Sequence, residues 1–161
     1  MVGNSPKRVV KQTMQLLDLP PVWLLGLLAG TYALHLALPQ VGFGPLALPE
    51  LGAVFIMLGI GLMLCAMWEF LRARTTIMPR ATPTAFLQRG IYRFSRNPIY
   101  LGDALVLLGA VLWWNIAPAI LFVPLFIFLI NKRFIEGEEA GLRALYGAEF
   151  EEWSRKVRRW I

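Results

Sequence analysis

Uncharged apolar stretches alternate with short polar segments along the chain, and their lengths predict helices that cross a membrane. Residues 21–38 and 51–68 are two such stretches of 18 residues without a formal charge. Each is long enough for roughly 27 Å of helix, the minimum for spanning a bilayer. A third stretch of 30 residues, 101–130, contains a single charged residue, Asp103. One helix of that length would measure about 45 Å, too long for a single crossing of a ~30 Å hydrocarbon core.

A break inside the third stretch predicts two helices joined as a hairpin. The sequence Trp-Trp-Asn at 113–115 is followed by Pro118, and proline interrupts a continuing helix. We therefore expect helices at 99–113 and 116–131, with the two indoles at the membrane interface that tryptophan prefers. Together with the two helices before them, they predict an all-α integral membrane protein with about four transmembrane helices.

The final segment, residues 134–161, is amphipathic and predicts a further helix at the membrane surface. Its apolar residues recur at spacings of three and four, the period of one helix face: Leu142, Tyr146, Phe150, Trp153, Val157 and Trp160. Acidic residues precede basic ones along it, as the helix dipole favours. For the N-terminal segment, an interfacial helix over residues 9–17 and a frayed tail are equally good interpretations.

The composition places the chain among small membrane proteins with one domain, residues 1–161. Of its 161 residues, 57% are hydrophobic and 16% are charged, which is too apolar for a soluble domain of this size. Cys65 and His35 are the only residues of their types. The sequence therefore excludes a disulfide framework and a metal site built from cysteine and histidine clusters.

Basic residues fall into three groups that predict how the helices are oriented. The 16 Lys and Arg residues lie before the first apolar stretch, between residues 72 and 96, or between residues 132 and 159. An even number of crossings brings all three groups to one side, which by the positive-inside rule is the cytoplasm. We therefore expect an integral protein of the inner (cytoplasmic) membrane with both termini in the cytoplasm.

The most unusual polar segment, residues 89–102, reads RGIYRFSRNPIYLG between two apolar stretches. Pro98 pushes Asn97 out of the helical region and suits the first turn of a following helix. Three arginines precede that turn: Arg89, Arg93 and Arg96. A helix N-terminus with free amides beside guanidinium groups predicts an anion site, so an acidic small molecule is the expected ligand.

Two separated motifs carry a family resemblance that covers residues 75–161. The first is GIYR at 90–93 followed by RNPIYLG at 96–102. The second comprises Glu138-Glu139, Leu142, Tyr146-Gly147, Phe150, Trp153 and Val157-Arg158-Arg159. In this order they resemble the isoprenylcysteine carboxyl methyltransferase family, integral-membrane enzymes that use S-adenosylmethionine and share a cofactor site with phospholipid N-methyltransferases. Asn97 stands where the eukaryotic enzymes typically have histidine, and Tyr146 where phenylalanine is commoner.

The resemblance implies S-adenosylmethionine as the cofactor, and the motif residues suit its chemistry. Carboxylates can accept hydrogen bonds from its ammonium and ribose diol, and an arginine can bind its carboxylate in a fork. Aromatic side chains and the backbone can bracket the adenine. The residues expected to hold the cofactor are Tyr92, Asn97, Pro98, Tyr100, Leu101, Gly102, Glu138, Glu139 and Tyr146. We expect the amphipathic helix to close this pocket on the cytoplasmic side.

Other residues of the motifs are expected to act on the substrate. Arg96 and Glu139 are the predicted catalytic residues, and the predicted substrate contacts are Arg96, Asp103, Trp153 and Arg158. Asp103 is a functional candidate because an ionisable residue inside a membrane segment is costly, although a hydrogen bond between packed helices is an equal alternative. Arg96 could instead pair with a lipid phosphate. Gly102 and Gly109 allow either close helix packing or room for the cofactor.

These observations predict an S-adenosylmethionine-dependent membrane methyltransferase that acts on a small lipophilic carboxylate, thiol or amine. The partners expected are a lipophilic or lipid substrate and the membrane, with no nucleic acid and no obligate protein partner. Three alternatives remain open: a phospholipid N-methyltransferase, a non-enzymatic lipid-binding membrane module, and a membrane reductase. The reductase ranks last, because 161 residues leave little room for a nicotinamide dinucleotide site, and the chain has no Rossmann fingerprint.

Overall fold

The computed structural model describes residues 18–44, 48–74 and 86–161, and every regular element within these ranges is a helix. Three helical segments are long and apolar enough to cross a membrane: Pro20–Ala37, Pro49–Ala73 and Ala117–Lys156. The predicted all-α membrane architecture is therefore confirmed at this level, whereas the number of crossings stays a prediction. The interfacial helix considered for residues 9–17 lies outside the described ranges.

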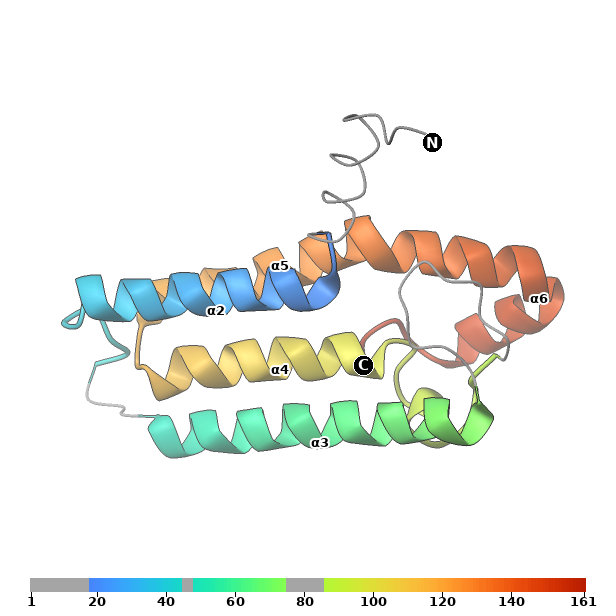
Figure 1. Ribbon diagram of the computed structural model, residues 1–161, viewed down its shortest axis with the longest axis horizontal. Coiled ribbons are helices and arrows are strands. Elements are labelled where there is room, and N and C mark those ends of the chain that lie inside the picture. The colour runs from blue at the N-terminus through green and yellow to red at the C-terminus, as the bar shows by residue number, and fades with distance from the viewer. Residues whose placement is uncertain (1–17, 45–47, 75–85) are drawn as a thin grey trace, which may run out of the picture.

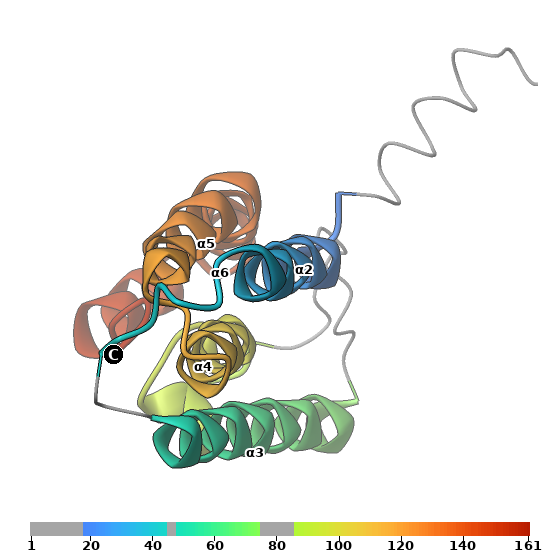
Figure 2. The same ribbon diagram turned by 90° about the vertical axis from the view of Figure 1, so that its left-hand side faces the viewer.

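Four apolar helices lie side by side in an elongated bundle (Figure 1). They are α2 (Pro20–Ala37), α3 (Pro49–Ala73), α4 (Pro98–Trp113) and α5 (Phe122–Ile130). Viewed from one end, α4 lies between α3 on one side and the α2–α5 pair on the other (Figure 2). Each of α2, α3 and α4 begins with proline in its first turn, where the missing amide hydrogen leaves no intrahelical bond unmade.

The interior of the bundle is formed where α4 meets α2 and α5. Its largest buried cluster contains Tyr100, Ala104 and Leu107 of α4 with Phe126 and Ile130 of α5. Apolar side chains of α2 pack against this cluster. Large apolar side chains also cover the outer faces of α2, α3 and α5, which a lipid environment accommodates at no hydrophobic cost.

The predicted break near residue 115 is where the chain turns from α4 into α5. Asn115 has the left-handed conformation, with φ of 49°, and a 3₁₀ turn, η2 (Ala117–Leu121), leads into α5. The Asn115 side-chain oxygen accepts a hydrogen bond of 3.0 Å from the amide of Phe43. The amide of Ala117 donates to the carbonyl of Val41 at 3.1 Å. These bonds join the loop after α2 to the α4–α5 turn.

The helix α3 continues beyond its uncharged stretch, which ends at Trp68. It extends to Ala73 and ends where Arg74 adopts the left-handed conformation, with φ of 51°. Charged residues mark the end of the apolar surface without ending the helix, because glutamate and arginine are good helix formers. As a result, Glu69 and Arg72 are carried on the last turns of a regular helix.

The C-terminal segment, predicted as an amphipathic helix over residues 134–161, is a helix with a break inside it. α5 runs through a π-helical turn, η3 (Asn131–Ile135), into α6 (Glu136–Lys156). Non-helical angles at Gly147 (φ 47°, ψ −117°) break α6, and its second part turns back toward the bundle (Figure 1). Glycine reaches this backbone region without a Cβ penalty, and the apolar period of the sequence does not reveal where the helix breaks.

Two pairs of glycines bring the backbones of the antiparallel helices α3 and α4 into contact. A Cβ atom on Gly59 would lie 2.5 Å from the carbonyl oxygen of Gly102, and one on Gly52 would lie 2.6 Å from that of Gly109. The reciprocal distances, from Gly102 and Gly109, are 2.7 and 2.6 Å. Close helix packing is therefore the role that the structure gives Gly102 and Gly109, in the manner of small-residue contacts between membrane helices.

We expect Gly59→Ala to lower the thermal stability of the protein in detergent, because the added methyl group collides with the backbone of α4. Overpacking of this kind costs about 1–3 kcal/mol. Gly61→Ala is the matched control, since a Cβ at Gly61 on the same helix has no neighbour within 4 Å. Melting curves of both variants decide the matter, and equal melting temperatures would contradict the glycine contact.

Candidate functional site

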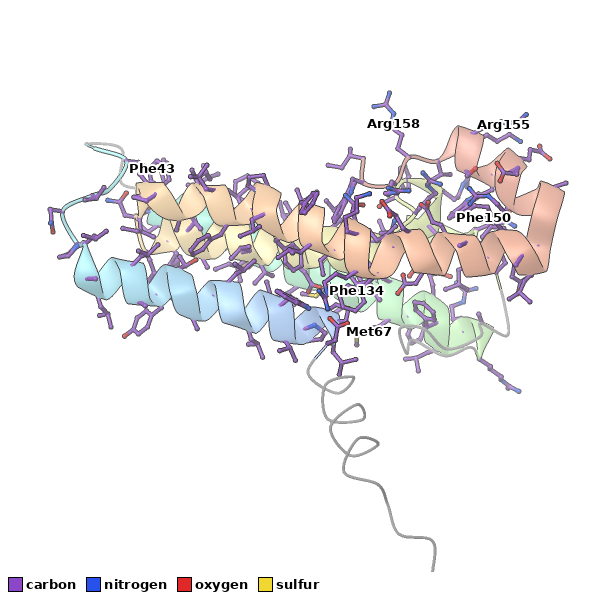
Figure 3. All side chains as sticks on the ribbon, turned by 90° about the horizontal axis from the view of Figure 1, so that it is seen from above. Phe43, Met67, Phe134, Phe150, Arg155 and Arg158 are labelled. Atoms are coloured by element: carbon purple, nitrogen blue, oxygen red, sulfur yellow. The ribbon has the colours of Figure 1, made fainter. Side chains whose placement is uncertain are left out.

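The two predicted motifs meet at the end of the bundle where α3 ends and α4 begins. A 3₁₀ turn, η1 (Gly90–Arg93), precedes α4, which starts at Pro98 as predicted. The turned-back part of α6 lies at this same end (Figure 3). Residues from α3, η1 and α6 form one buried cluster: Ala66, Tyr92, Phe150, Trp153 and Val157. Sequence segments more than forty residues apart therefore build one site.

The C-terminal tail is held against the loop before α4 by backbone carbonyls. The amide of Arg96 donates to the carbonyl of Arg158 at 3.0 Å. The side chains of Asn97 and Ser95 donate to the carbonyl of Arg159 at 3.0 and 3.4 Å, respectively. Asn97, which we predicted to contact the cofactor, therefore anchors the tail, and the side chain of Arg159 is carried into the site.

The Glu139 cluster, which we define as Glu139, Arg96 and Arg159, is the centre of the site. The carboxylate is buried, with 7% exposure, and Arg159 binds it in a fork through Nε at 3.1 Å and Nη2 at 2.6 Å. Arg96 approaches the same carboxylate through Nη1 at 3.2 Å. Two guanidinium groups on one carboxylate leave a net positive charge, which favours a further anion.

Electrostatic effects within the Glu139 cluster act in opposite directions on its two arginines. Burial lowers the pKa of Arg96, the Glu139 carboxylate raises it, and the nearby charge of Arg159 lowers it again. The pKa of Arg159 is raised, chiefly by its hydrogen bond to Glu139. Both guanidinium groups remain charged at physiological pH because their pKa starts so high. The cluster therefore presents fixed positive charge.

Glu138 forms a second contact between the motifs, next to the Glu139 cluster. The hydroxyl group of Tyr100 on α4 donates to its Oε1 atom at 2.8 Å. Tyr92 is buried, and its pKa is raised first by burial and then by the negative charges of Glu138 and Glu69. Asp103 is also buried, one turn beyond Tyr100 along α4. The predicted carboxylates and tyrosines thus surround the start of α4.

Two buried donors at the site have no hydrogen-bond partner in the described part of the chain: Nε of Arg96 and Nε1 of Trp153. Leaving such a donor unpaired costs about 1–3 kcal/mol, and nearly all buried donors in proteins are paired. Unpaired donors are a feature of sites that bind an acceptor-bearing ligand. They therefore mark this region as a place where a polar ligand can bind.

Aromatic rings line one side of the site. Phe86 stacks on Tyr146 with ring centres 5.0 Å apart and meets the edge of Trp153 at 4.9 Å. The ring of Phe150 lies 5.9 Å from that of Phe86. Stacked and edge-on rings of this kind pack as one apolar cluster, which includes the buried Trp153 and Phe150. The predicted roles of Tyr146 and Trp153 stay predictions.

Some predicted site residues do not reach this region. The side chains of Arg89 and Arg93 are exposed, and of the three arginines Arg96 belongs to the Glu139 cluster. The side chain of Arg158 is exposed and projects away from the bundle (Figure 3). Arg93 follows the buried Tyr92, and Arg158 precedes Arg159, whose side chain binds Glu139.

Sequence analysis did not single out Arg159, Ser95 or Phe86 as site residues. Arg159 belongs to the Val-Arg-Arg end of the second motif, but its neighbour Arg158 was chosen instead. The helix dipole explained the basic end equally well, so the sequence carried no signal to separate the two arginines. Ser95 and Phe86 lie outside both quoted motifs, and only the folded chain brings them to the site.

Comparisons with known proteins place the chain in a family. The family described as "Phospholipid methyltransferase" matches residues 49–149. A protein of Haemophilus influenzae (strain ATCC 51907 / DSM 11121 / KW20 / Rd), described as "Uncharacterized protein", is 40% identical over 63 residues, which are 39% of this chain and 100% of that protein. No solved structure matches the chain. Because the family match covers more than half of the sequence and includes the first motif and the first part of the second, the chain belongs to the phospholipid methyltransferase family.

Proposed function

We propose that the protein transfers the methyl group of S-adenosylmethionine to a small lipophilic acceptor, which is a carboxylate, a thiol or an amine. The family indicates methyltransferase activity in general. The observation that supports the proposal most directly is the convergence of the two motifs on Glu139, which brings Arg96, Arg159 and Glu138 to one place. Methylation of phospholipid amines is the alternative within the same chemistry.

The residues at the site fit S-adenosylmethionine. This cofactor supplies a methyl group already activated by a sulfonium. Its carboxylate and adenine nitrogens are acceptors of the kind that the unpaired donors of Arg96 and Trp153 need. Glu138 offers a carboxylate oxygen to an ammonium group or a ribose diol, and Glu139 holds the two guanidinium groups in place for an acidic group. The stacked rings of Phe86 and Tyr146 suit the flat face of a purine.

Positioning is the main contribution that we assign to the protein's own residues. Displacement at a methyl group needs the nucleophile held in line, and orientation supplies much of the rate of such reactions. The Glu139 cluster fixes the loop before α4 relative to α6, and Arg96 and Arg159 attract an acidic group. A carboxylate or thiolate acceptor needs no base. For an amine acceptor, Glu138 and Asp103 are the carboxylates available beside Tyr100.

We further propose that both termini lie in the cytoplasm and that the site faces the cytoplasmic side of the inner membrane. Every Lys and Arg of the described ranges lies at the site end of the bundle or on α6. The opposite end, with the loop after α2 and the α4–α5 turn, carries none in its described part. A one-sided distribution of this kind is the pattern of the positive-inside rule.

Glu139→Gln should raise the dissociation constant of S-adenosylmethionine by roughly tenfold or more, because a charged hydrogen bond contributes about 1.5–3 kcal/mol. Calorimetry in detergent measures this constant. Glu152→Gln is the matched control, since the exposed Glu152 pairs only with Lys156 on the far side of the kink. Equal S-adenosylmethionine affinity in the two variants would show that Glu139 does not contribute to cofactor binding.

Trp153→Phe keeps an aromatic ring but removes the unpaired Nε1 donor. If this donor serves the cofactor, S-adenosylmethionine affinity should fall about twofold to tenfold, the range of a neutral hydrogen bond. The melting temperature without cofactor should fall as well, because the smaller ring leaves a cavity in the buried cluster. Trp113→Phe, at the other end of α4, should change neither quantity. Unaltered cofactor affinity in Trp153→Phe would show that the donor does not contact the cofactor.

The orientation is tested by placing single cysteines in a Cys65→Ala background. A membrane-impermeant maleimide added from outside the cytoplasmic membrane should label Gln40→Cys, in the exposed loop after α2, and should not label Ala148→Cys, exposed on α6. Labelling of Ala148→Cys alone would reverse the orientation. Labelling of both or of neither in sealed cells would contradict the even number of crossings.

A further inference from the structure

The π-helical turn η3 rotates α6 relative to α5. Ile135 lies nine residues after Phe126, which is about two and a half turns of a regular α-helix, so the two side chains would face opposite ways. Both are instead fully buried in the same cluster beside α4. The wider turn allows this because it takes up an extra residue: the amide of Glu136 donates to the carbonyl of Asn131, five residues back.

This rotation decides which glutamate enters the Glu139 cluster. In an uninterrupted α-helix, the residue four positions after the buried Phe134 would face the bundle, and that residue is Glu138. The structure buries Glu139 instead, in the fork of Arg159. Glu138 lies beside it and accepts the hydrogen bond of Tyr100. The places of both carboxylates therefore depend on the extra residue that η3 takes up.

Two successive residues of the C-terminal tail bind the helix on either side of this rotation. Arg159 binds Glu139, which follows η3. The Nε1 atom of Trp160 donates to Oδ1 of Asn131, the first residue of η3, at 3.3 Å. Asn131 and Trp160 are both half-buried, and the ring of Trp160 packs against the buried cluster between α4 and α5. The tail thus bridges the π-helical turn from its inner side.

The other polar side-chain contacts printed on η3 lie on its exposed side. Lys132 pairs with Glu136 at 2.7 Å, and Arg133 pairs with Asp18 at 2.9 Å. Exposed ion pairs of this kind contribute little to stability, because water and salt screen them. The hydrogen bond between Trp160 and Asn131 is therefore the polar contact best placed to hold the turn in its π-helical form.

We propose that Asn131 and Trp160 are positioning residues of the site: their hydrogen bond holds η3 in its π-helical form and thereby fixes the rotation that turns Glu139 inward. Their effect reaches a bound cofactor through the rotation of α6 and needs no contact of their own with it. π-Helical turns are rare and occur frequently at functional sites. The effect on S-adenosylmethionine binding rests on the proposed function, whereas the control of the rotation does not.

The first test measures S-adenosylmethionine affinity by calorimetry on the full-length protein in detergent. Asn131→Leu removes the acceptor oxygen at similar volume and should raise the dissociation constant about twofold to tenfold, the effect of one neutral hydrogen bond. Asn131→Asp keeps an acceptor oxygen and should bind like wild type. Lys132→Ala is the matched control on the same turn and should also bind like wild type, since it removes only the exposed pair with Glu136.

A double variant shows whether the two side chains act through their common hydrogen bond. Trp160→Phe should weaken S-adenosylmethionine binding, because its ring has no donor for Asn131. Adding Asn131→Leu to Trp160→Phe should cause no further loss, whereas independent effects would multiply.

The rotation itself can be measured without cofactor. In a Cys65→Ala background, Ile135→Cys should react slowly with a maleimide, because the Ile135 side chain is fully buried. Adding Asn131→Leu should speed this labelling several-fold as the turn loosens and α6 rotates. Adding Asn131→Asp should leave the labelling slow, since the hydrogen bond from Trp160 is kept.

The inference is overturned if Asn131→Leu leaves either the cofactor affinity or the labelling rate unchanged. It is also overturned if Asn131→Asp or Lys132→Ala loses as much affinity as Asn131→Leu, or if Asn131→Leu weakens binding further in Trp160→Phe. Failure of the wild-type protein to bind S-adenosylmethionine would count against the proposed function, and the labelling rates would then decide the inference by themselves.

Discussion

The fork between Arg159 and Glu139 is the interaction on which the arrangement of this site depends. It joins the end of the chain to the first part of α6, and the carbonyls of the same tail accept hydrogen bonds from the loop before α4. Burying the Glu139 carboxylate and most of Arg96 is costly, and removing one partner of a buried pair commonly costs about 3–5 kcal/mol. Here the cluster fixes two positively charged guanidinium groups at the site, which also contains the unpaired donors Nε of Arg96 and Nε1 of Trp153.

Backbone contact between α3 and α4 sets the position of the start of α4 relative to α3. The pairs Gly59–Gly102 and Gly52–Gly109 set the distance and register of the helices. Because Gly102 is the last residue of the first motif, the same contact that packs the bundle also positions Tyr100 against Glu138. One short segment, η1, then supplies Tyr92 to the inner site and Gly90 to an open apolar groove beside α3. Packing and ligand chemistry therefore share one element.

The site end of the molecule contrasts with the rest of the bundle. The opposite end is closed by polar contacts between the loop after α2 and the α4–α5 turn. At the site end, charged residues lie near aromatic rings, and the segment η1 borders both the buried cluster and the apolar groove.

Local features of the sequence were sufficient to predict most of the fold. Apolar length, proline positions and the Trp-Trp-Asn break predicted the helical membrane class, the start of α4 at Pro98 and the turn into α5, because these signals act within a few residues. The motifs likewise led to Glu138, Glu139 and Tyr100. These are the parts of the protein that the sequence by itself determined.

Only the tertiary structure decided which motif residues meet. The choice of Arg159 over Arg158, the exposure of Arg89 and Arg93, and the use of Asn97 to hold the tail all follow from contacts between residues far apart in the chain. The kink at Gly147 and the groove beside Gly90 depend on backbone angles that only glycine adopts freely, yet most glycines in the chain do not adopt them. The packing of distant segments decides which glycine adopts these backbone angles, and the local sequence does not reveal it.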